Sequence, residues 1–205
     1  MKWSVLIVGI GAIAFSLIII FLTLGLPVRD SYAKSVAPVT KPVAPASRPA
    51  VLKSDPSLPV RLMVPQVHID AAIEQVGLTA DGSVDVPKGH NDVAWFKLSP
   101  RPGASGNAVL IGHYGVWKNG QPTVFNNLSK LRQGDKIYVK DGRGVITTFL
   151  VRESKTYGPT DEASAVFIAN DGKAHLNLVT CQGAWDKVSK SYPRRLVIFA
   201  DAERR

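Results

Sequence analysis

The sequence predicts an all-β domain, either a barrel or a sandwich, that follows an N-terminal membrane helix. Three observations support this prediction. After residue 60 the chain consists of short apolar runs separated by Gly, Pro, Asp and Asn, a texture typical of many short strands. Helix signals are sparse in the same region. Near the amino terminus, residues 5–26 form an apolar run without a single charge.

The apolar run at residues 5–26 is long enough to cross a bilayer. Its 22 residues would span roughly 33 Å as a helix, against a hydrocarbon core of about 30 Å. A cleaved signal peptide is the alternative, with Ser31-Tyr32-Ala33 as a weak cleavage site. The apolar core of a signal peptide is normally only about 7–15 residues long, so the run favours a transmembrane anchor.

Charge does not decide the orientation of this anchor. Lys2 precedes it and three basic residues follow it soon after, whereas basic residues usually favour the cytoplasmic side. The formal net charge is +9, and residues 1–54 contribute +5 of it from six Lys/Arg and one Asp. A basic tail beside a membrane suits anionic lipid or an anionic cell wall better than nucleic acid. The sequence contains no nucleic-acid-binding motif.

Residues 27–59 form a linker that is rich in Pro, Ala, Val and Ser. This composition favours an extended, semi-rigid polyproline spacer over a packed core. The sequence therefore predicts a short tail at residues 1–4, the anchor, the linker, and one folded domain at residues 60–205.

Nine apolar segments of this domain are candidate strands, and Gly-, Asp- or Pro-containing turns separate many of them. The candidate strands are residues 61–64, 69–76, 84–86, 93–96, 108–112, 136–139, 145–151, 176–180 and 196–200. Thr123 is a candidate cap for a short helix that continues to Lys130, and residues 161–165 are a candidate single turn.

Cys181 is the only cysteine in the sequence. Residues 175–181 alternate between apolar and polar, which predicts a half-buried strand with the thiol at its C-terminal end, before Gln182-Gly183. A single thiol cannot form an internal disulfide, so in an exported protein it indicates a reactive thiol or an intermolecular bridge. The alternative is a small buried apolar side chain, because free cysteine is among the most buried residue types.

His113 is the strongest candidate partner for this thiol among four histidines. It follows the buried-type strand at residues 108–112 at a glycine-flanked corner, the same kind of position that the thiol occupies. The other three are weaker candidates. His68 and His90 fall in predicted loops, and His175 lies six residues before the cysteine, roughly 20 Å away along a strand.

The pair Arg194-Arg195 stands immediately before the apolar strand at residues 196–200. If this strand pairs antiparallel with the thiol strand, its start lies beside Cys181. A guanidinium there would offer fixed donors to a developing oxyanion, as acyl transfer requires. The alternative is a solvated basic pair near the C-terminus.

These three strand ends resemble those of the sortase family. Leu178-Val179-Thr180-Cys181 is similar to the strand end that carries the sortase nucleophile, Gly112-His113 to the sortase histidine, and Arg195 to the arginine at the start of the last sortase strand. Arg195 has the spacing usual in the family, five residues before Ala200, and Arg194 is the reserve. Sortases often have Thr where this chain has Leu178.

Further segments are similar to class F sortases, a mainly actinobacterial group. They are residues 76–87, Trp95-Phe96 and residues 100–103. The chain departs from class F at Tyr114-Gly115-Val116, where members often have Val-Asp-Ser.

The resemblance implies a closed sortase-type β-barrel of about eight strands with one or two short helices and no cofactor. It implies a cysteine transpeptidase that cleaves an LPXTG-like sorting signal on exported proteins through a thioacyl-enzyme. The acceptor would be an amine of a peptidoglycan precursor or of a pilin. Cys181 would be the nucleophile, His113 the general acid and base, and Arg195 the oxyanion stabiliser. The domain would then lie outside the cell on a single-pass anchor.

Three residues are candidates for binding the substrate. Thr180 would order the arginine or the peptide, or would be plain strand surface, and Arg194 lies beside the proposed site. Trp185, like Trp117, follows a catalytic strand end and would either wall the peptide groove or pack at the rim. No metal site is expected, because the sequence lacks a His-Glu-X-X-His motif and paired cysteines. The scattered acidic residues suit turns better than calcium: Asp81, Asp85 and Asp92.

Two other functions are alternatives. A non-catalytic, membrane-tethered barrel for binding or scaffolding would explain the anchor, linker and strands, but not the cysteine, histidine and arginine at three strand ends. The second alternative is a thiol enzyme of another family. L,D-transpeptidases typically show a Ser-His-Gly-Cys run, which is absent, and papain-like peptidases place their cysteine early, at a helix start. Cys181 is late and follows a strand.

Overall fold

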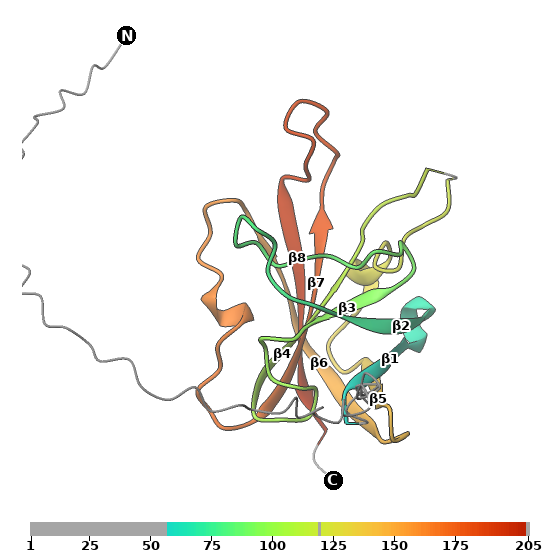
Figure 1. Ribbon diagram of the computed structural model, residues 1–205, viewed down its shortest axis with the longest axis vertical. Coiled ribbons are helices and arrows are strands. Elements are labelled where there is room, and N and C mark those ends of the chain that lie inside the picture. Colours follow the sequence, from blue (N-terminus) through green and yellow to red (C-terminus); the bar gives the residue numbers. More distant parts are fainter. Residues whose placement is uncertain (1–56, 119, 204–205) are drawn as a thin grey trace, which may run out of the picture. The chain divides into compact units, whose positions relative to one another are not determined.

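The computed structural model describes residues 57–118 and 120–203 (Figure 1). The predicted anchor at residues 5–26 and nearly all of the predicted linker lie outside the described residues. Within the described part of the chain, no helix has the length and apolar character needed to span a membrane.

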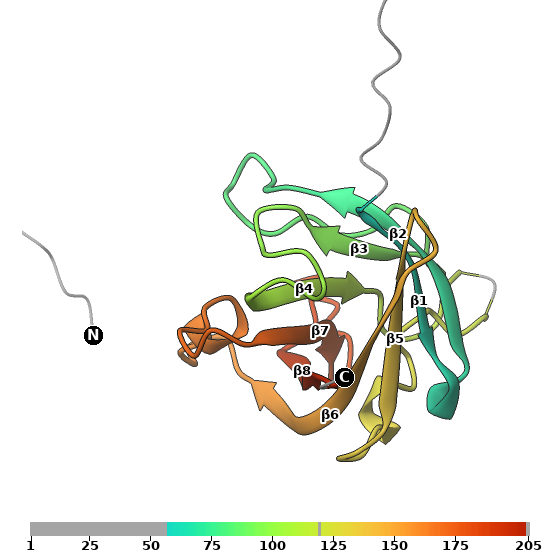
Figure 2. The ribbon, with the colours of Figure 1, turned by 90° about the horizontal axis from the view of Figure 1, so that it is seen from below.

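Eight strands close into a barrel in the order β1-β2-β3-β4-β7-β8-β6-β5, and they surround one interior (Figure 2). The strands are β1 (Pro59–Val64), β2 (Ile69–Val76), β3 (Val93–Phe96), β4 (Gly106–Gly112), β5 (Lys136–Asp141), β6 (Ile146–Tyr157), β7 (Ala174–Gln182) and β8 (Arg194–Ala202). The β2–β3 and β4–β7 pairs are parallel and the other pairs are antiparallel. The predicted closed barrel of about eight strands is confirmed.

The barrel interior is a single apolar core built from alternate residues of the strands. In β7, Leu176 and Leu178 point inward, and in β8, Leu196 and Ile198 do so. Burying an aliphatic side chain of this size contributes roughly 1.5–3 kcal/mol relative to leaving it in water. The period-two spacing of these residues fixes which face of each strand enters the core.

A second, smaller cluster lies on the outer face of the barrel, beneath the connection from β6 to β7. Tyr157, Val166, Val197 and Phe199 are all buried there. Since both faces of β4 and β8 are covered at this place, residues 108–111 and 196–200 appear in the sequence as continuous apolar runs.

Three short 3-10 helices accompany the strands in the described residues: η1 (Pro65–Val67), η2 (Leu128–Lys130) and η3 (Ser164–Val166). This is one more than predicted, and none is an α-helix. The predicted helix from Thr123 is reduced to η2, because the Thr123 hydroxyl donates to the carbonyls of His113 and Gly115 and so does not cap a helix. The single turn predicted at residues 161–165 forms slightly later, as η3.

The predicted strand at residues 84–86 does not form. Only an isolated bridge joins Leu78 to Val84. The segment before it is a tight turn in which the Asp81 carboxylate accepts hydrogen bonds from Thr79 and Ser83. Local side-chain hydrogen bonds of this kind compete with a sheet ladder.

Candidate active site

Three strand ends meet at one end of the barrel. β7 and β8 are antiparallel, and Cys181 lies directly opposite Arg195, as the sequence predicted. β4 and β7 are parallel with Ile111 opposite Val179, so His113, two residues further along, comes out beside Cys181. His113 lies 68 positions before Cys181 in the sequence and Arg195 lies 14 positions after it, and the barrel brings all three to one place.

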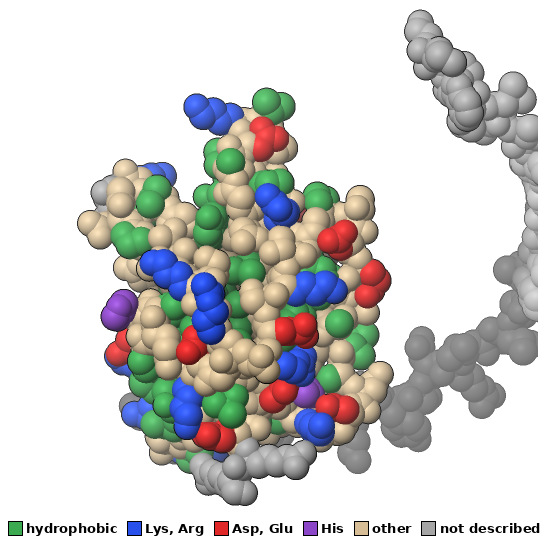
Figure 3. All heavy atoms as spheres, turned by 180° about the vertical axis from the view of Figure 1, so that it is seen from behind, with side chains coloured by type: hydrophobic (Ala, Val, Ile, Leu, Met, Phe, Trp, Pro, Cys, Tyr) green, Lys and Arg blue, Asp and Glu red, His purple; other side chains and the backbone are tan. Residues whose placement is uncertain are grey.

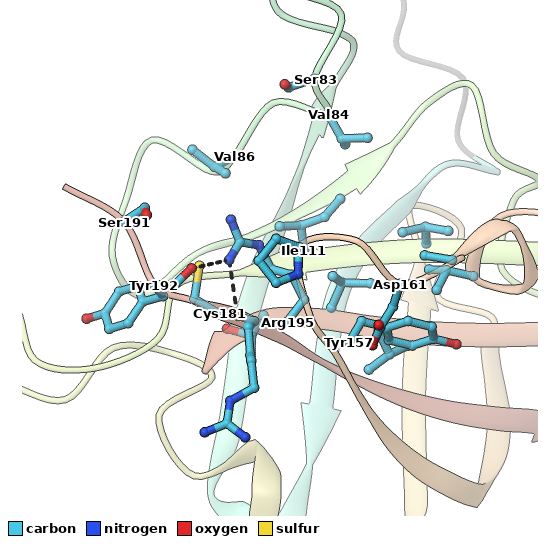
Figure 4. Close-up of a pocket in the computed structure, with 18 of the residues that line it drawn as sticks. Ser83, Val84, Val86, Ile111, Tyr157, Asp161, Cys181, Ser191, Tyr192 and Arg195 are labelled. Atoms are coloured by element: carbon cyan, nitrogen blue, oxygen red, sulfur yellow. Dashed lines mark hydrogen bonds between the residues drawn. The ribbon is translucent and has the colours of Figure 1, made fainter. Parts of the chain in front are cut away.

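A pocket of about 680 Å³ opens at this place and is lined by His113, Cys181 and Arg195. Its walls also come from the 83–86 segment, from the β6–β7 connection and from the residues just before β8. Apolar side chains of the strands and of η3 make up much of the surface: Val109, Ile111, Val166, Val179 and Val197. In Figure 4, Tyr192, Cys181 and Arg195 lie close together on one side of the pocket.

The Cys181 side chain is half-buried. Burial raises the pKa of its thiol, and the positive charge of Arg195 opposes that rise. Burial disfavours the charged form of any acid, whereas a nearby cation favours it. Arg195 therefore favours the thiolate against the effect of burial.

Arg195 is held by the backbone of its own segment. Its Nη1 donates to the carbonyl of Tyr192 at 2.9 Å and to that of Arg194 at 3.1 Å, as the dashed lines of Figure 4 show. A guanidinium has five N–H donors, so these two bonds fix its position and leave donors for a ligand. Arg194 lines the same pocket but lies opposite Gln182, one residue away from the thiol's cross-strand neighbour.

The His113 ring contacts the loop that precedes β3. Its Nε2 lies 2.8 Å from the carbonyl oxygen of Pro87. Because a carbonyl can only accept, Nε2 carries the hydrogen, and Nδ1 is the nitrogen able to take up or release a proton. The backbone carbonyl of His113 accepts from the Thr123 hydroxyl at 2.8 Å and from the Phe125 amide at 3.0 Å.

Thr180 is 2% exposed, and its Oγ1 donates to the carbonyl of Gly112 at 2.7 Å. Its hydroxyl thus joins the end of the β7 strand to the end of β4. The residue before the cysteine is bonded to the residue before the histidine, which fixes the relative position of His113 and Cys181. The hydroxyl bonds to neither arginine.

The two tryptophans lie at the rim. Trp185 is 51% exposed and packs edge-on against Tyr192 with ring centroids 5.0 Å apart, but does not itself line the pocket. Trp117 is 39% exposed and stacks on His90 at 5.0 Å. Tyr192 does line the pocket and was not singled out from the sequence, where its only signal is its place just before the arginine pair.

The remaining histidines are held elsewhere. His175 lies 2.7 Å from Asp201 and 3.0 Å from Asp171 and does not line the pocket, as predicted from its distance along the strand. His68 ends η1 with a left-handed φ of 57°. Across residues 57–118 and 120–203, no three His, Cys, Asp or Glu side chains are grouped as metal ligands would be.

Comparison with known proteins identifies the family. The sortase-domain family model matches residues 62–203, which is more than half of the chain. A search of curated proteins found no match.

Solved sortase structures share the fold. Sortase C-1 from Actinomyces oris is 23% identical with a TM-score of 0.58, over 74% of this chain and 77% of that one. A Clostridium perfringens sortase D5 transpeptidase is 21% identical with a TM-score of 0.53, over 71% and 79%. Sortase A from Corynebacterium diphtheriae is 19% identical with a TM-score of 0.56, over 75% and 64%. With the family match over nearly the whole barrel, the chain belongs to the sortase family.

Proposed function

We propose that this chain is a membrane-anchored cysteine transpeptidase. It cleaves an LPXTG-like sorting signal of exported proteins and transfers the cleaved protein to an amine of the cell wall or of a pilin. The observation that carries the proposal is the convergence of Cys181, His113 and Arg195 on one pocket. A non-catalytic scaffold barrel has no need of this convergence.

In the first half-reaction, the Cys181 thiolate attacks the carbonyl carbon of the signal's Thr residue. Arg195, fixed by its two backbone bonds, donates to the oxygen on which negative charge develops. The peptide C–N bond then breaks, and protonated His113 gives its Nδ1 proton to the leaving amine. The products are a thioacyl-enzyme, the released peptide amine and a neutral imidazole.

In the second half-reaction, the acceptor amine attacks the thioacyl carbon. Neutral His113 takes the amine's proton at Nδ1, the C–S bond breaks, and Cys181 leaves as a thiolate. The enzyme returns to its starting protonation state, with the exported protein joined to the acceptor through a new amide.

The rest of the pocket supports a role in holding the peptide. Its apolar strand residues suit apolar side chains of a sorting signal. Arg194 and Thr180 are our proposed substrate-binding residues at the polar end, with Thr180 acting through the Gly112 carbonyl that it fixes. Trp185 contributes by supporting Tyr192 at the rim.

The membrane anchor, the extracellular location and the class F assignment rest on the sequence. The uncharged run at residues 5–26 and the Pro-rich linker support a domain that is anchored through a long spacer. Class F is supported by the similarity of residues 76–87 and 100–103, while the solved structures compared above carry class C, D and A names.

The deciding experiment is to trap the thioacyl intermediate. The full chain is incubated with a library of sorting peptides, and a mass spectrum of the intact protein identifies the acyl group on Cys181. We expect an adduct whose mass equals that of one peptide's acyl portion up to and including the Thr of its motif. The Cys181→Ala variant should unfold at the same temperature as the parent chain and give neither adduct nor cleavage. Substantial peptide cleavage by this variant would refute the assignment, and an inert native thiol would favour the scaffold.

A further inference from the structure

Two connections project from the barrel at the end that carries the pocket (Figure 1). The first follows β4 and ends in Val116-Trp117-Lys118, which we call the first tip. The second joins β7 to β8 and carries residues 185–190, the second tip. The proposed function uses the bases of these connections, at His113 and Tyr192, and the contact of Trp185 with Tyr192. It gives no role to the first tip or to residues 187–190.

Both tips expose large apolar side chains next to lysines. Val188 is 93% exposed and Val116 is 68% exposed, and the two tip tryptophans are partly exposed. Figure 3 shows apolar and basic side chains together at both projections. Apolar groups displayed on projecting loops and flanked by charge mark an interaction surface.

The tips are preformed. In the first, the Trp117 amide donates to the Gln121 carbonyl at 2.7 Å. In the second, the Asp186 carboxylate accepts from the Val188 amide at 2.8 Å and from the Ser189 hydroxyl at 2.7 Å. The acidic side chain is therefore occupied within its own turn.

The charge of the tips is positive. Lys118 stands in the first tip and Lys187 and Lys190 in the second, against Asp186 alone. The Val188 side chain thus sits between two lysines at the end of a hairpin. Such a surface complements a partner with an anionic surface layer over an apolar interior.

We propose that the two tips dock on an anionic lipid surface. The valine and tryptophan side chains enter the headgroup region, where tryptophan is favoured, and the lysines contact the phosphates. This docking turns the mouth of the pocket towards the bilayer. It rests on the proposed membrane anchor for its location, but not on the proposed chemistry.

The predicted linker is long enough for this arrangement. The domain begins at the opposite end of the barrel, since Pro59 pairs with Asp141, far from Cys181. A linker of residues 27–59 in polyproline geometry, at about 3.1 Å per residue, would reach on the order of 100 Å. The barrel is shorter, because a nine-residue strand such as β8 covers roughly 30 Å.

The test measures lipid contact at the second tip. In the full chain with Cys181→Ala, one cysteine is placed at the tip by Val188→Cys, or at the far end by Val145→Cys as the matched control. Val145 is also an exposed valine, at 46%. Each cysteine carries an environment-sensitive fluorophore, and the protein is reconstituted into phosphatidylcholine vesicles with or without phosphatidylglycerol, containing a lipid-bound quencher.

We expect quenching at position 188 but not at 145, and only when phosphatidylglycerol is present. Removing both charges with Lys187→Gln and Lys190→Gln should lower the ratio of docked to free domain about 30-fold, since each lysine near such a surface contributes roughly fivefold. Quenching at 188 that is no greater than at 145, or that is independent of the anionic lipid, overturns the proposal. Because every variant lacks the thiol, the result does not depend on transpeptidation.

Discussion

Two opposing effects act on the pKa of the Cys181 thiol. Burial raises this pKa, and the Arg195 charge lowers it. The two arginines differ in register, since Arg195 pairs with Cys181 and Arg194 pairs with Gln182. Only the first is placed to favour the thiolate and to donate to an oxyanion in the proposed reaction.

We therefore predict that Arg195→Gln changes the pH dependence of the thiol and that Arg194→Gln does not. Without the neighbouring cation, the thiol pKa rises further, so alkylation of Cys181 slows at neutral pH and recovers only at higher pH. Peptide cleavage should fall about 10²–10³-fold, the usual cost of losing an oxyanion donor. The rate of iodoacetamide labelling as a function of pH measures the first effect. A larger change in Arg194→Gln would assign the role to the other arginine.

At the residue scale, sequence reasoning can propose a site residue only where the side chain itself carries the signal. His113 and Arg195 could be singled out because each stands at the end of an apolar strand. Pro87 could not, since it contacts His113 through its backbone carbonyl, and any residue type supplies that group. Tyr192 was missed because an aromatic residue before a strand has no chemical pattern of its own.

The β6–β7 connection is the element that most depends on side-chain anchors. Asn107 donates from Nδ2 to the Ala165 carbonyl at 2.8 Å, and Asn177 donates to the Val166 carbonyl at 2.7 Å. Both amides are buried on the outer face of neighbouring strands. They hold η3 against the barrel, and with it a wall of the pocket.

We predict that Asn177→Leu loosens this wall without disturbing the thiol. The Val166 carbonyl loses its partner, and a buried unpaired carbonyl costs about 1–3 kcal/mol. The variant should show a raised KM for the sorting peptide, faster amide hydrogen exchange over residues 158–168, and an unchanged rate of Cys181 alkylation. Asn91→Leu, at an exposed asparagine, serves as the control. Unchanged exchange in the Asn177 variant would exclude the anchoring role.

The accuracy of the predicted strand bounds differs from strand to strand. The predicted bounds of β2 and β3 agree with the structure, whereas β6 continues six residues beyond its predicted end. Residues 152–156 are polar and exposed, yet they pair with β8 beyond an irregularity between Val151 and Glu153. A ladder made by the backbone leaves no mark in the hydrophobic pattern, so it could not be found from the sequence.

At the scale of the whole molecule, the described residues form a closed barrel with its own apolar core. Its sheet closes without a free edge. Its core is built from the strands together with four residues of the connections: Val67, Phe125, Leu128 and Leu131. All eight strands that close the barrel lie within residues 59–202. If residues 1–56 anchor the domain as proposed, their contribution is to raise its concentration near membrane-bound substrates.

We predict that a chain starting at residue 57 distinguishes soluble from membrane-bound substrates. Its rate on a free sorting peptide should stay within about twofold of the full chain's rate. Its rate on a sorting substrate anchored in the same vesicles should fall by about 10²-fold or more, because tethering supplies an effective concentration of that order. Both rates are followed by mass spectrometry of the cleaved product.

A full chain whose residues 27–56 are replaced by a Gly/Ser segment of equal length is the control, and it should retain both rates, since the anchor remains. If the shortened chain instead loses both rates equally, residues 1–56 serve the fold or the chemistry. The distinction follows from mass action: a tether changes how often enzyme and anchored substrate meet, and it leaves the barriers at Cys181 unchanged.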